Sequence, residues 1–204
     1  MQIDLETRTV TLGVGEFAEL TFGPSRSDGS RAGLWRARLG QAWHGEMQDR
    51  TRQSDPEARF EVALSGRLRW RGWTIRLNGR IDQVVEAEDT VLLREIKTVR
   101  TPLPATPVDL RRLHSSYFRQ LAVYRALARD NETFGPDPIE AELTFIDIDS
   151  GITQSVPLGD EDDQGLELQL EDLWRFVERL RGRARAASDR RGATGARLGE
   201  VRIW

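Results

Sequence analysis

Residues 79–98 read GRIDQVVEAEDTVLLREIKT, and the pattern of this stretch is the clearest indication of the chain's architecture. Two apolar, β-branched runs separated by an acidic turn predict two consecutive strands. Asp82 lies on the first strand, and Glu95 and Lys97 lie on the second. Because residues two apart on a strand point to the same face, Glu95 and Lys97 project together while Ile96 faces the opposite side. If the two strands pair, Asp82 reaches the same face.

Lys97 is the only lysine of the chain, whereas the other 29 of the 30 basic residues are arginines. Lysine is a compact ammonium that can sit beside one water or one phosphate oxygen, and its pKa can shift, whereas arginine stays charged and flat. A lone lysine can be an accident of composition. The carboxylates of Asp82 and Glu95 beside it favour a catalytic interpretation.

Two carboxylates and an ammonium at the end of a sheet form an oxygen-rich site of the kind that binds Mg²⁺ or Mn²⁺. Hydrolysis of a phosphodiester needs such parts, because a metal polarises the phosphoryl oxygen and activates water while a further cation stabilises the developing charge. The stretch therefore predicts a metal-dependent phosphodiester hydrolase.

The remaining patterns predict an α/β domain in which helices flank a mixed sheet. A loose alternation over residues 8–22 indicates short strands, and residues 25–33 form a polar loop. The expected elements after it are a helix over residues 34–52, strands over 60–64, 73–85 and 90–98, a helix over 107–128, strands over 139–148 and 152–156, and a helix over 166–180.

Composition describes one globular domain of 204 residues with 38% apolar and 31% charged residues. No run approaches the roughly 20 apolar residues that a membrane span requires, so no membrane partner is expected. Because the chain has no cysteine, disulfides and thiolate metal sites are excluded, and we expect a cytoplasmic protein. Any metal must be held by oxygen and imidazole.

The charge is segregated along the chain despite a formal net charge of −3. Residues 60–130 carry 13 Lys or Arg against 8 Asp or Glu, whereas residues 136–172 carry 12 acids and no base. The basic share, which includes Arg67, Arg69, Arg71, Arg76 and Arg80, surrounds the proposed site. It suits contacts with a phosphate backbone, although an ordinary solvated strand face is the alternative.

Four motifs follow one another in the order found in a known family. They are a histidine on a preceding helix (His44), Gly-x-x-Asp at 79–82, acidic-x-Lys at 95–97, and Gln-x-x-x-Tyr at 120–124. Over residues 34–150 the chain thereby resembles the PD-(D/E)xK nuclease superfamily, and within it the RecB-like branch. The resemblance implies a restriction-endonuclease-like core with a mixed central sheet. The four cysteines that hold an iron–sulfur cluster in some RecB-like nucleases do not occur here, and Glu95 stands where aspartate is common.

The resemblance also implies roles for individual residues. His44, Asp82, Glu95 and the backbone carbonyl of Ile96 would ligate Mg²⁺ or Mn²⁺. Lys97 would position or polarise the attacking water.

Three further residues are expected to serve the nucleic acid. Gln120 and Tyr124 lie one helical turn apart and share a face, so the resemblance implies that they contact DNA or orient Lys97. Tyr124 as a plain core residue is an equal alternative. Arg80 is expected to contact the nucleic acid, and His114 is read as a surface residue.

The resemblance implies a metal-dependent DNA nuclease that acts on single-stranded DNA in preference to duplex. The expected division is residues 1–33 as N-terminal strands and loop, 34–180 as the nuclease domain, and 181–204 as an Arg/Gly-rich tail or linker. Because relatives work with ATP-driven helicases and this chain has no phosphate loop of its own, we expect a helicase in cis or in trans and a role in DNA repair, recombination or defence. The apolar residues at 201–204 favour a module of a longer chain, and a free-standing nuclease with a disordered tail is the alternative. The alternatives are an inactive nuclease-fold module that binds or scaffolds nucleic acid, and a domain whose acidic surface at 136–172 binds a partner.

Overall fold

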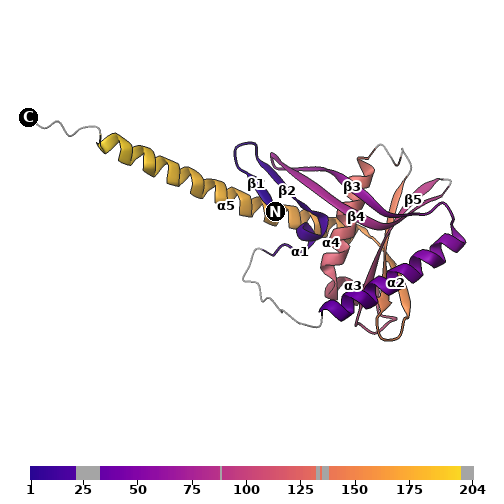
Figure 1. Ribbon diagram of the computed structural model, residues 1–204. Helices are drawn as coiled ribbons and strands as arrows, with labels where there is room; N and C mark the ends of the chain where they lie inside the picture. The colour runs from indigo at the N-terminus through magenta and orange to yellow at the C-terminus, as the bar shows by residue number, and fades with distance from the viewer. Residues whose placement is uncertain (22–32, 88, 132–133, 135–137, 199–204) are drawn as a thin grey trace, which may run out of the picture.

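The computed structural model describes residues 1–21, 33–87, 89–131, 134 and 138–198. Its strands are β1 (Gln2–Asp4), β2 (Thr9–Gly13), β3 (Arg59–Trp70), β4 (Trp73–Ala87), β5 (Thr90–Val99), β6 (Ile139–Asp147) and β7 (Thr153–Pro157). Its helices are α1 (Val14–Glu19), α2 (Gly33–Ser54), α3 (Pro107–Leu113), α4 (Ser115–Arg129) and α5 (Asp160–Leu198). Figure 1 shows the strands crossing in the middle of the molecule, with helices packed around them.

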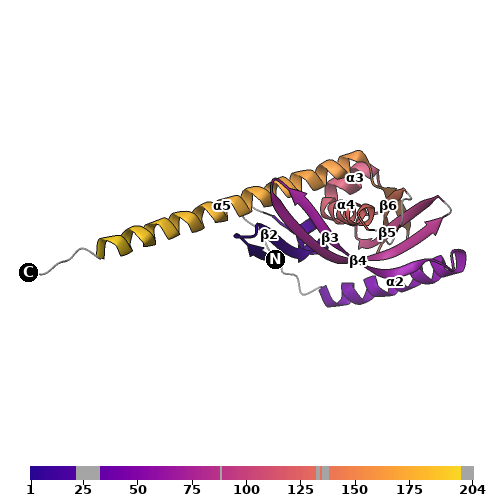
Figure 2. The ribbon, with the colours of Figure 1, turned by 90° about the horizontal axis from the view of Figure 1, so that it is seen from above.

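The strands form one mixed sheet in the order β1-β2-β4-β5-β6-β7, with β3 on the other edge of β4. β2 and β4 are parallel, as are β5 and β6, and the remaining pairs are antiparallel. Figure 2 shows α2 below the strands and α4 above them. The predicted mixed sheet flanked by helices is confirmed.

One edge of β4 is shared by two strands, and this fork positions the candidate site. Residues 74–78 of β4 pair with β2, and residues 83–87 pair with β5. Residues 79–82, the Gly-x-x-Asp motif, lie between the two pairings. The other edge of β4 pairs with β3 along nearly its whole length.

The core fills the space between the sheet and the helices α4 and α5. α4 contributes a run of fully buried residues that includes Leu121, Val123 and Leu127, and α5 contributes Leu170, Leu173 and Val177. Apolar positions at steps of three and four on these helices produce this packing, as the sequence pattern predicts.

Three expectations about secondary structure are wrong. The single helix expected over residues 107–128 is divided into α3 and α4, because His114 leaves the helical backbone conformation with φ −124° and ψ 35°. Residues 14–19 form helix α1 rather than a strand, and the Glu16 side chain accepts a hydrogen bond from the Gly13 N–H at 3.4 Å at its start. α5 continues to Leu198, where a tail was expected from residue 181, because Arg and Ala in this stretch are good helix formers. Figures 1 and 2 show this end of α5 projecting beyond the sheet.

β1 and β2 precede the expected boundary at residue 33 but belong to the same sheet as the later strands, because β1 pairs with β2 and β2 pairs with β4. Residues 25–32 of the expected polar loop and the apolar residues 201–204 lie outside the described residues. Among the helices of the described residues, none is long and apolar enough to span a membrane.

Candidate active site

The site begins where the pairing of β4 with β5 ends. The last pair in the ladder is Gln83 with Arg94, and the next position sets Asp82 opposite Glu95. Here the carboxylate of Asp82 replaces the backbone pairing, because its Oδ2 accepts a hydrogen bond from the Ile96 N–H at 2.7 Å. Asp82 and Glu95 are only 9% and 3% exposed. The fork thus brings two carboxyl groups together in a largely dry place.

Glu95 is held by two donors on one of its oxygens. Glu95 Oε1 accepts hydrogen bonds from Lys97 Nζ at 2.8 Å and from Gln120 Nε2 on α4 at 2.9 Å. Glu95 Oε2 is buried, and no hydrogen-bond donor lies on it among the described residues. An unsatisfied buried carboxylate oxygen is costly, so a cation bound to this oxygen would stabilise the site.

Burial sets the electrostatics of the pair. Burial raises the pKa of Glu95 from its ordinary value of 4.5 to about 7, the Lys97 ammonium opposes this shift, and the nearby Asp82 adds to it. Burial lowers the pKa of Lys97, but the carboxylates of Glu95 and Asp82 outweigh it and raise that pKa overall. Lys97 therefore stays protonated, while Glu95 changes its charge near neutral pH in the metal-free protein.

Lys97 also lies 5.1 Å from the centre of the Tyr117 ring. Tyr117 in turn stacks on His114 with ring centres 5.5 Å apart, and His114 Nε2 is 2.9 Å from Thr101 Oγ1. His114 is therefore half-buried beneath the site rather than a free surface residue, and burial lowers its pKa. The sequence pattern alone does not identify Tyr117 as part of the site, although its position three residues before Gln120 on the same helix is a usable signal.

His44 approaches the carboxylates from α2, on the other side of the sheet from α4. Its Nδ1 lies 3.7 Å from Asp82 Oδ1, a distance too long for a hydrogen bond. The neighbouring Trp43 packs its ring against Gly151 in the turn between β6 and β7. The tryptophan thus anchors α2 so that His44 faces Asp82.

The side chains suit a divalent cation, although they do not form a complete set of converging ligands. Within the described residues, no three His, Asp or Glu side chains converge as a ready-made metal cluster. Glu95 Oε2 has no donor, and Asp82 Oδ1 faces His44 rather than a backbone amide. Two carboxylates and one imidazole form a donor set that Mg²⁺ and Mn²⁺ accept. The structure shows Ile96 contributing its N–H to Asp82.

Tyr124 lies in the fork itself. Its hydroxyl accepts a hydrogen bond from the Arg80 N–H at 3.1 Å and donates one to the Arg80 carbonyl at 3.0 Å. A side chain at Gly79 would meet this hydroxyl at 2.6 Å, so glycine is what lets the tyrosine approach. Tyr124 is 2% exposed, which corrects the expected nucleic-acid contact in favour of a core position.

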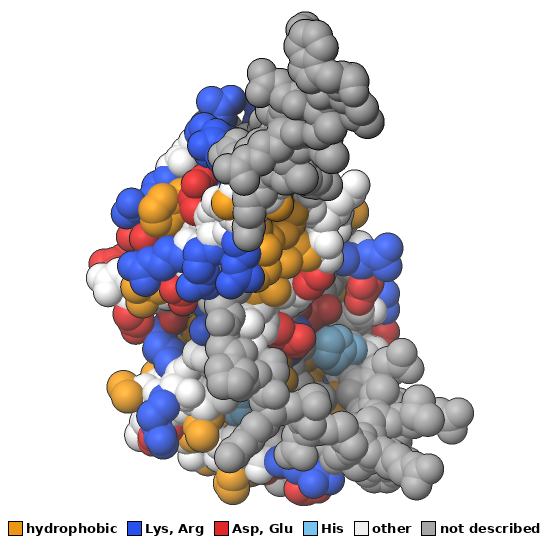
Figure 3. Space-filling view, turned by 90° about the vertical axis from the view of Figure 1, so that its left-hand side faces the viewer, with side chains coloured by type: hydrophobic (Ala, Val, Ile, Leu, Met, Phe, Trp, Pro, Cys, Tyr) orange, Lys and Arg blue, Asp and Glu red, His pale blue; other side chains and the backbone are white. Residues whose placement is uncertain are grey.

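The remaining expected residues are placed as follows. Gln120 reaches the site through Glu95. Arg80 is exposed next to the fork, with Nη1 3.8 Å from Glu61 Oε2. Figure 3 shows a band of Lys and Arg side chains on one face of the molecule, near acidic side chains and a histidine.

A mixed sheet whose fork gathers an aspartate, a glutamate and a lysine is the arrangement of the restriction-endonuclease-like nucleases. The chain belongs to the PD-(D/E)XK nuclease superfamily, which its sequence matches over residues 10–194.

Two solved structures, those of SSO0001 and of a putative exonuclease from Eubacterium rectale, agree with this fold. The protein SSO0001 is 17% identical, and the match covers 80% of this chain and 75% of that one with a TM-score of 0.51. A putative exonuclease from Eubacterium rectale is 12% identical over 89% of this chain and 87% of its own, with a TM-score of 0.52. An alkaline exonuclease from Laribacter hongkongensis is 15% identical over 90% and 97%, with a TM-score of 0.45. No curated protein sequence matches the chain.

Proposed function

We propose that this nuclease is a deoxyribonuclease that depends on Mg²⁺ or Mn²⁺. The single observation that supports this most is the buried Glu95 Oε2, which has no donor among the described residues and lies beside Asp82 and Lys97. A buried carboxylate oxygen in this position is stabilised by a bound cation. His44, Asp82, Glu95 and the carbonyl of Ile96 are the proposed ligands.

The bound metal would supply Lewis-acid polarisation of the scissile phosphate and of the attacking water. Lys97 is the protonated group next to that position, and it stabilises the negative charge that develops on the phosphate. Gln120 and Tyr117 hold the lysine and Glu95 in place through the contacts described above. Tyr124 acts one step further away, because it fixes the backbone that carries Asp82.

The order of the four motifs supports a place in the RecB-like branch, within which we infer a preference for single-stranded DNA. The same branch supports a partnership with an ATP-driven helicase, in cis or in trans, and a role in DNA repair, recombination or defence. The helix α5 would connect the nuclease to the helicase, since its last turns project beyond the sheet.

Incubation of linear and circular, single-stranded and duplex DNA with Mg²⁺ or Mn²⁺ tests the activity. Cleavage of at least one substrate by the natural protein, with none by Asp82→Ala, is the expected result. Calorimetric titration of Mn²⁺ should show that Asp82→Ala and Glu95→Ala each lose metal binding while the fold persists. Undiminished Mn²⁺ binding in either variant would remove that residue from the ligand set.

A further inference from the structure

Arg67 on β3 and Arg76 on β4 are direct cross-strand partners. Both side chains are exposed, and within the described residues no carboxylate pairs with either of them. Two like charges directly opposite each other on antiparallel strands destabilise a sheet. This arrangement therefore lowers the stability of the sheet, and no carboxylate among the described residues offsets the loss. It points to an anion that the two arginines bind.

The two arginines line a shallow hollow on the same face. Its other lining residues are Thr11, Ser65, Gly66, Leu77 and Asn78. Thr11 is the register partner of Arg76 on β2, and Ser65 is the partner of Asn78, so their side chains project to the same face. Two guanidinium groups, two hydroxyls and an amide are the donors that suit a phosphate oxygen.

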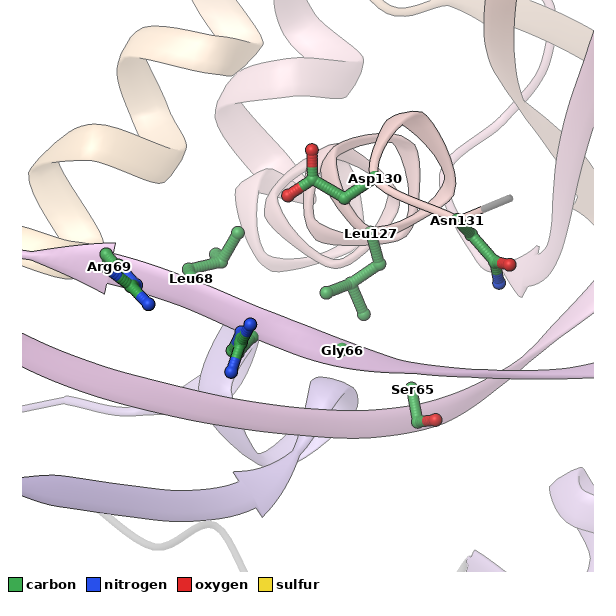
Figure 4. A pocket seen from close by; sticks show the side chains of 8 residues that line it. Ser65, Gly66, Leu68, Arg69, Leu127, Asp130 and Asn131 are labelled. Atoms are coloured by element: carbon green, nitrogen blue, oxygen red, sulfur yellow. The ribbon is translucent and has the colours of Figure 1, made fainter. Parts of the chain in front are cut away.

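The other face of β3 is closed by α4. Figure 4 shows Leu68 and Leu127 on the side of β3 that faces α4, whereas Ser65 points to the opposite side. A side chain at Gly66 would meet Leu127 at 3.0 Å, which confirms the tight packing there. The hollow at Arg67 and Arg76 is therefore on the solvent face of the β3–β4 hairpin rather than on its packed face.

The strand β4 leads from this hollow toward the site. Arg76, Asn78 and Arg80 are exposed and alternate with the buried Ile75, Leu77 and Ile81, and the buried Asp82 lies two residues beyond Arg80. At about 3.3 Å per residue, Arg76 lies roughly 20 Å along the strand from Asp82. That distance corresponds to about six nucleotide steps of a stacked strand at roughly 3.4 Å each, and to fewer steps of an extended single strand.

We propose that Arg67 and Arg76 bind a backbone phosphate of the nucleic-acid substrate up to about six nucleotides from the bond that is cut. This inference rests on the proposed function, because it places the site and the phosphate on one strand of the substrate. The positive charge of Arg80 lies between the Arg67/Arg76 pair and Asp82, where it would contact the substrate backbone between the two sites. A contact with a backbone phosphate carries no direct sequence information, so the pair should bind substrates of different sequence alike.

Fluorescent oligothymidylates of about 4, 8, 12 and 20 nucleotides test the proposal by anisotropy in Ca²⁺ and by cleavage in Mg²⁺ or Mn²⁺. For the natural protein, affinity and kcat/KM should step up between the 4-mer and the 8-mer. Arg67→Gln/Arg76→Gln should lose this increase in affinity and kcat/KM with substrate length. It should bind the 20-mer on the order of tenfold more weakly, and the slope of log affinity against log salt should fall by about 1.4. It should cut the 4-mer as the natural protein does.

Arg129→Gln/Arg179→Gln is the matched control, because both arginines are exposed on helices and the variant loses the same charge. It should keep the length step. If Arg67→Gln/Arg76→Gln keeps it as well, the inference is overturned while cleavage by the natural protein still supports the proposed function. A length step in binding without any cleavage would overturn the proposed function and leave the phosphate site standing. Absence of both binding and cleavage in the natural protein would overturn both.

Discussion

The hydroxyl of Tyr124 bonds both backbone groups of Arg80, accepting from the N–H at 3.1 Å and donating to the carbonyl at 3.0 Å. Arg80 lies where β4 has left β2 and has not yet joined β5. One side chain of α4 thus stands in for a missing neighbouring strand. The consequence is that the backbone leading to Asp82 is fixed by a tyrosine rather than by a ladder.

We expect Tyr124→Phe to destabilise the protein by about 1–3 kcal/mol, because it leaves buried backbone groups of Arg80 without partners. Gly79→Ala should cost a similar amount, since its new side chain would meet the tyrosine hydroxyl at 2.6 Å. The double variant should cost less than the sum, because removal of the hydroxyl relieves part of the clash. Urea denaturation of the four proteins gives the coupling energy.

Gly15→Ala is the control for the glycine change, since no atom lies within 4 Å of a side chain placed there on α1. It should be neutral or slightly stabilising. Strict additivity of Gly79→Ala and Tyr124→Phe would show that the two residues do not act on each other.

Part of the fold could be predicted from local patterns. The strands around Asp82 and Lys97 and the helix that carries Gln120 repeat with periods of two and 3.6 residues, and those periods are visible without tertiary contacts. The fork could not be predicted, because it depends on parallel pairing of β2 with β4 across about 60 residues of chain. α1 is too short for a period to show.

The candidate site could likewise be predicted only in part from the sequence. The spacing of Asp82, Glu95 and Lys97 fixed their common location, since it depends on strand geometry alone. The contacts of Tyr117 with Lys97 and of Trp43 with Gly151 depend on how helices dock on the sheet. Apolar stripes do not reveal such contacts.

Glu95 makes the stability of the metal-free protein depend on pH. Its folded pKa of about 7 is above the ordinary value of 4.5, so the folded protein holds this proton more tightly than the unfolded chain. The free energy of unfolding should therefore fall as pH rises from about 4.5 to about 7, by on the order of 3 kcal/mol, and then level off. Urea denaturation in EDTA at several pH values measures this fall.

Glu95→Gln should flatten that curve, because glutamine has no charge to lose. Glu140→Gln, at an exposed position on β6, is the control and should keep the fall. A fall of equal size in Glu95→Gln would assign the pH dependence to other groups.

Gly151→Ala should weaken metal binding from a distance. Gly151 has a φ of +72°, and a side chain there would meet the Trp43 ring at 2.6 Å, so the substitution pushes α2 away from the turn. His44 would then move from its position 3.7 Å from Asp82. We expect a loss of about 10- to 100-fold in Mn²⁺ affinity by calorimetry, as for residues that orient a ligand.

Gly45→Ala provides the comparison, because Gly45 is next to His44 on α2 and nothing lies within 4 Å of a new side chain. It should raise stability by up to about 1 kcal/mol and leave Mn²⁺ affinity unchanged. Equal Mn²⁺ affinity in Gly151→Ala and the natural protein would remove Trp43 from the positioning of His44.

Lys97 separates metal binding from catalysis. Its ammonium fits between Glu95 Oε1 at 2.8 Å and the Tyr117 ring at 5.1 Å, a gap that suits a compact cation. Lys97→Ala should keep Mn²⁺ binding and lose about 10²- to 10³-fold in kcat, because the ammonium acts mainly in the transition state. Lys97→Arg should not restore the rate, since a planar guanidinium cannot present its charge at the same point. Single-turnover cleavage rates and Mn²⁺ titrations of the three proteins measure both effects. A near-natural rate in Lys97→Arg would mean that positive charge alone suffices and that the single lysine of the chain is not there for its shape.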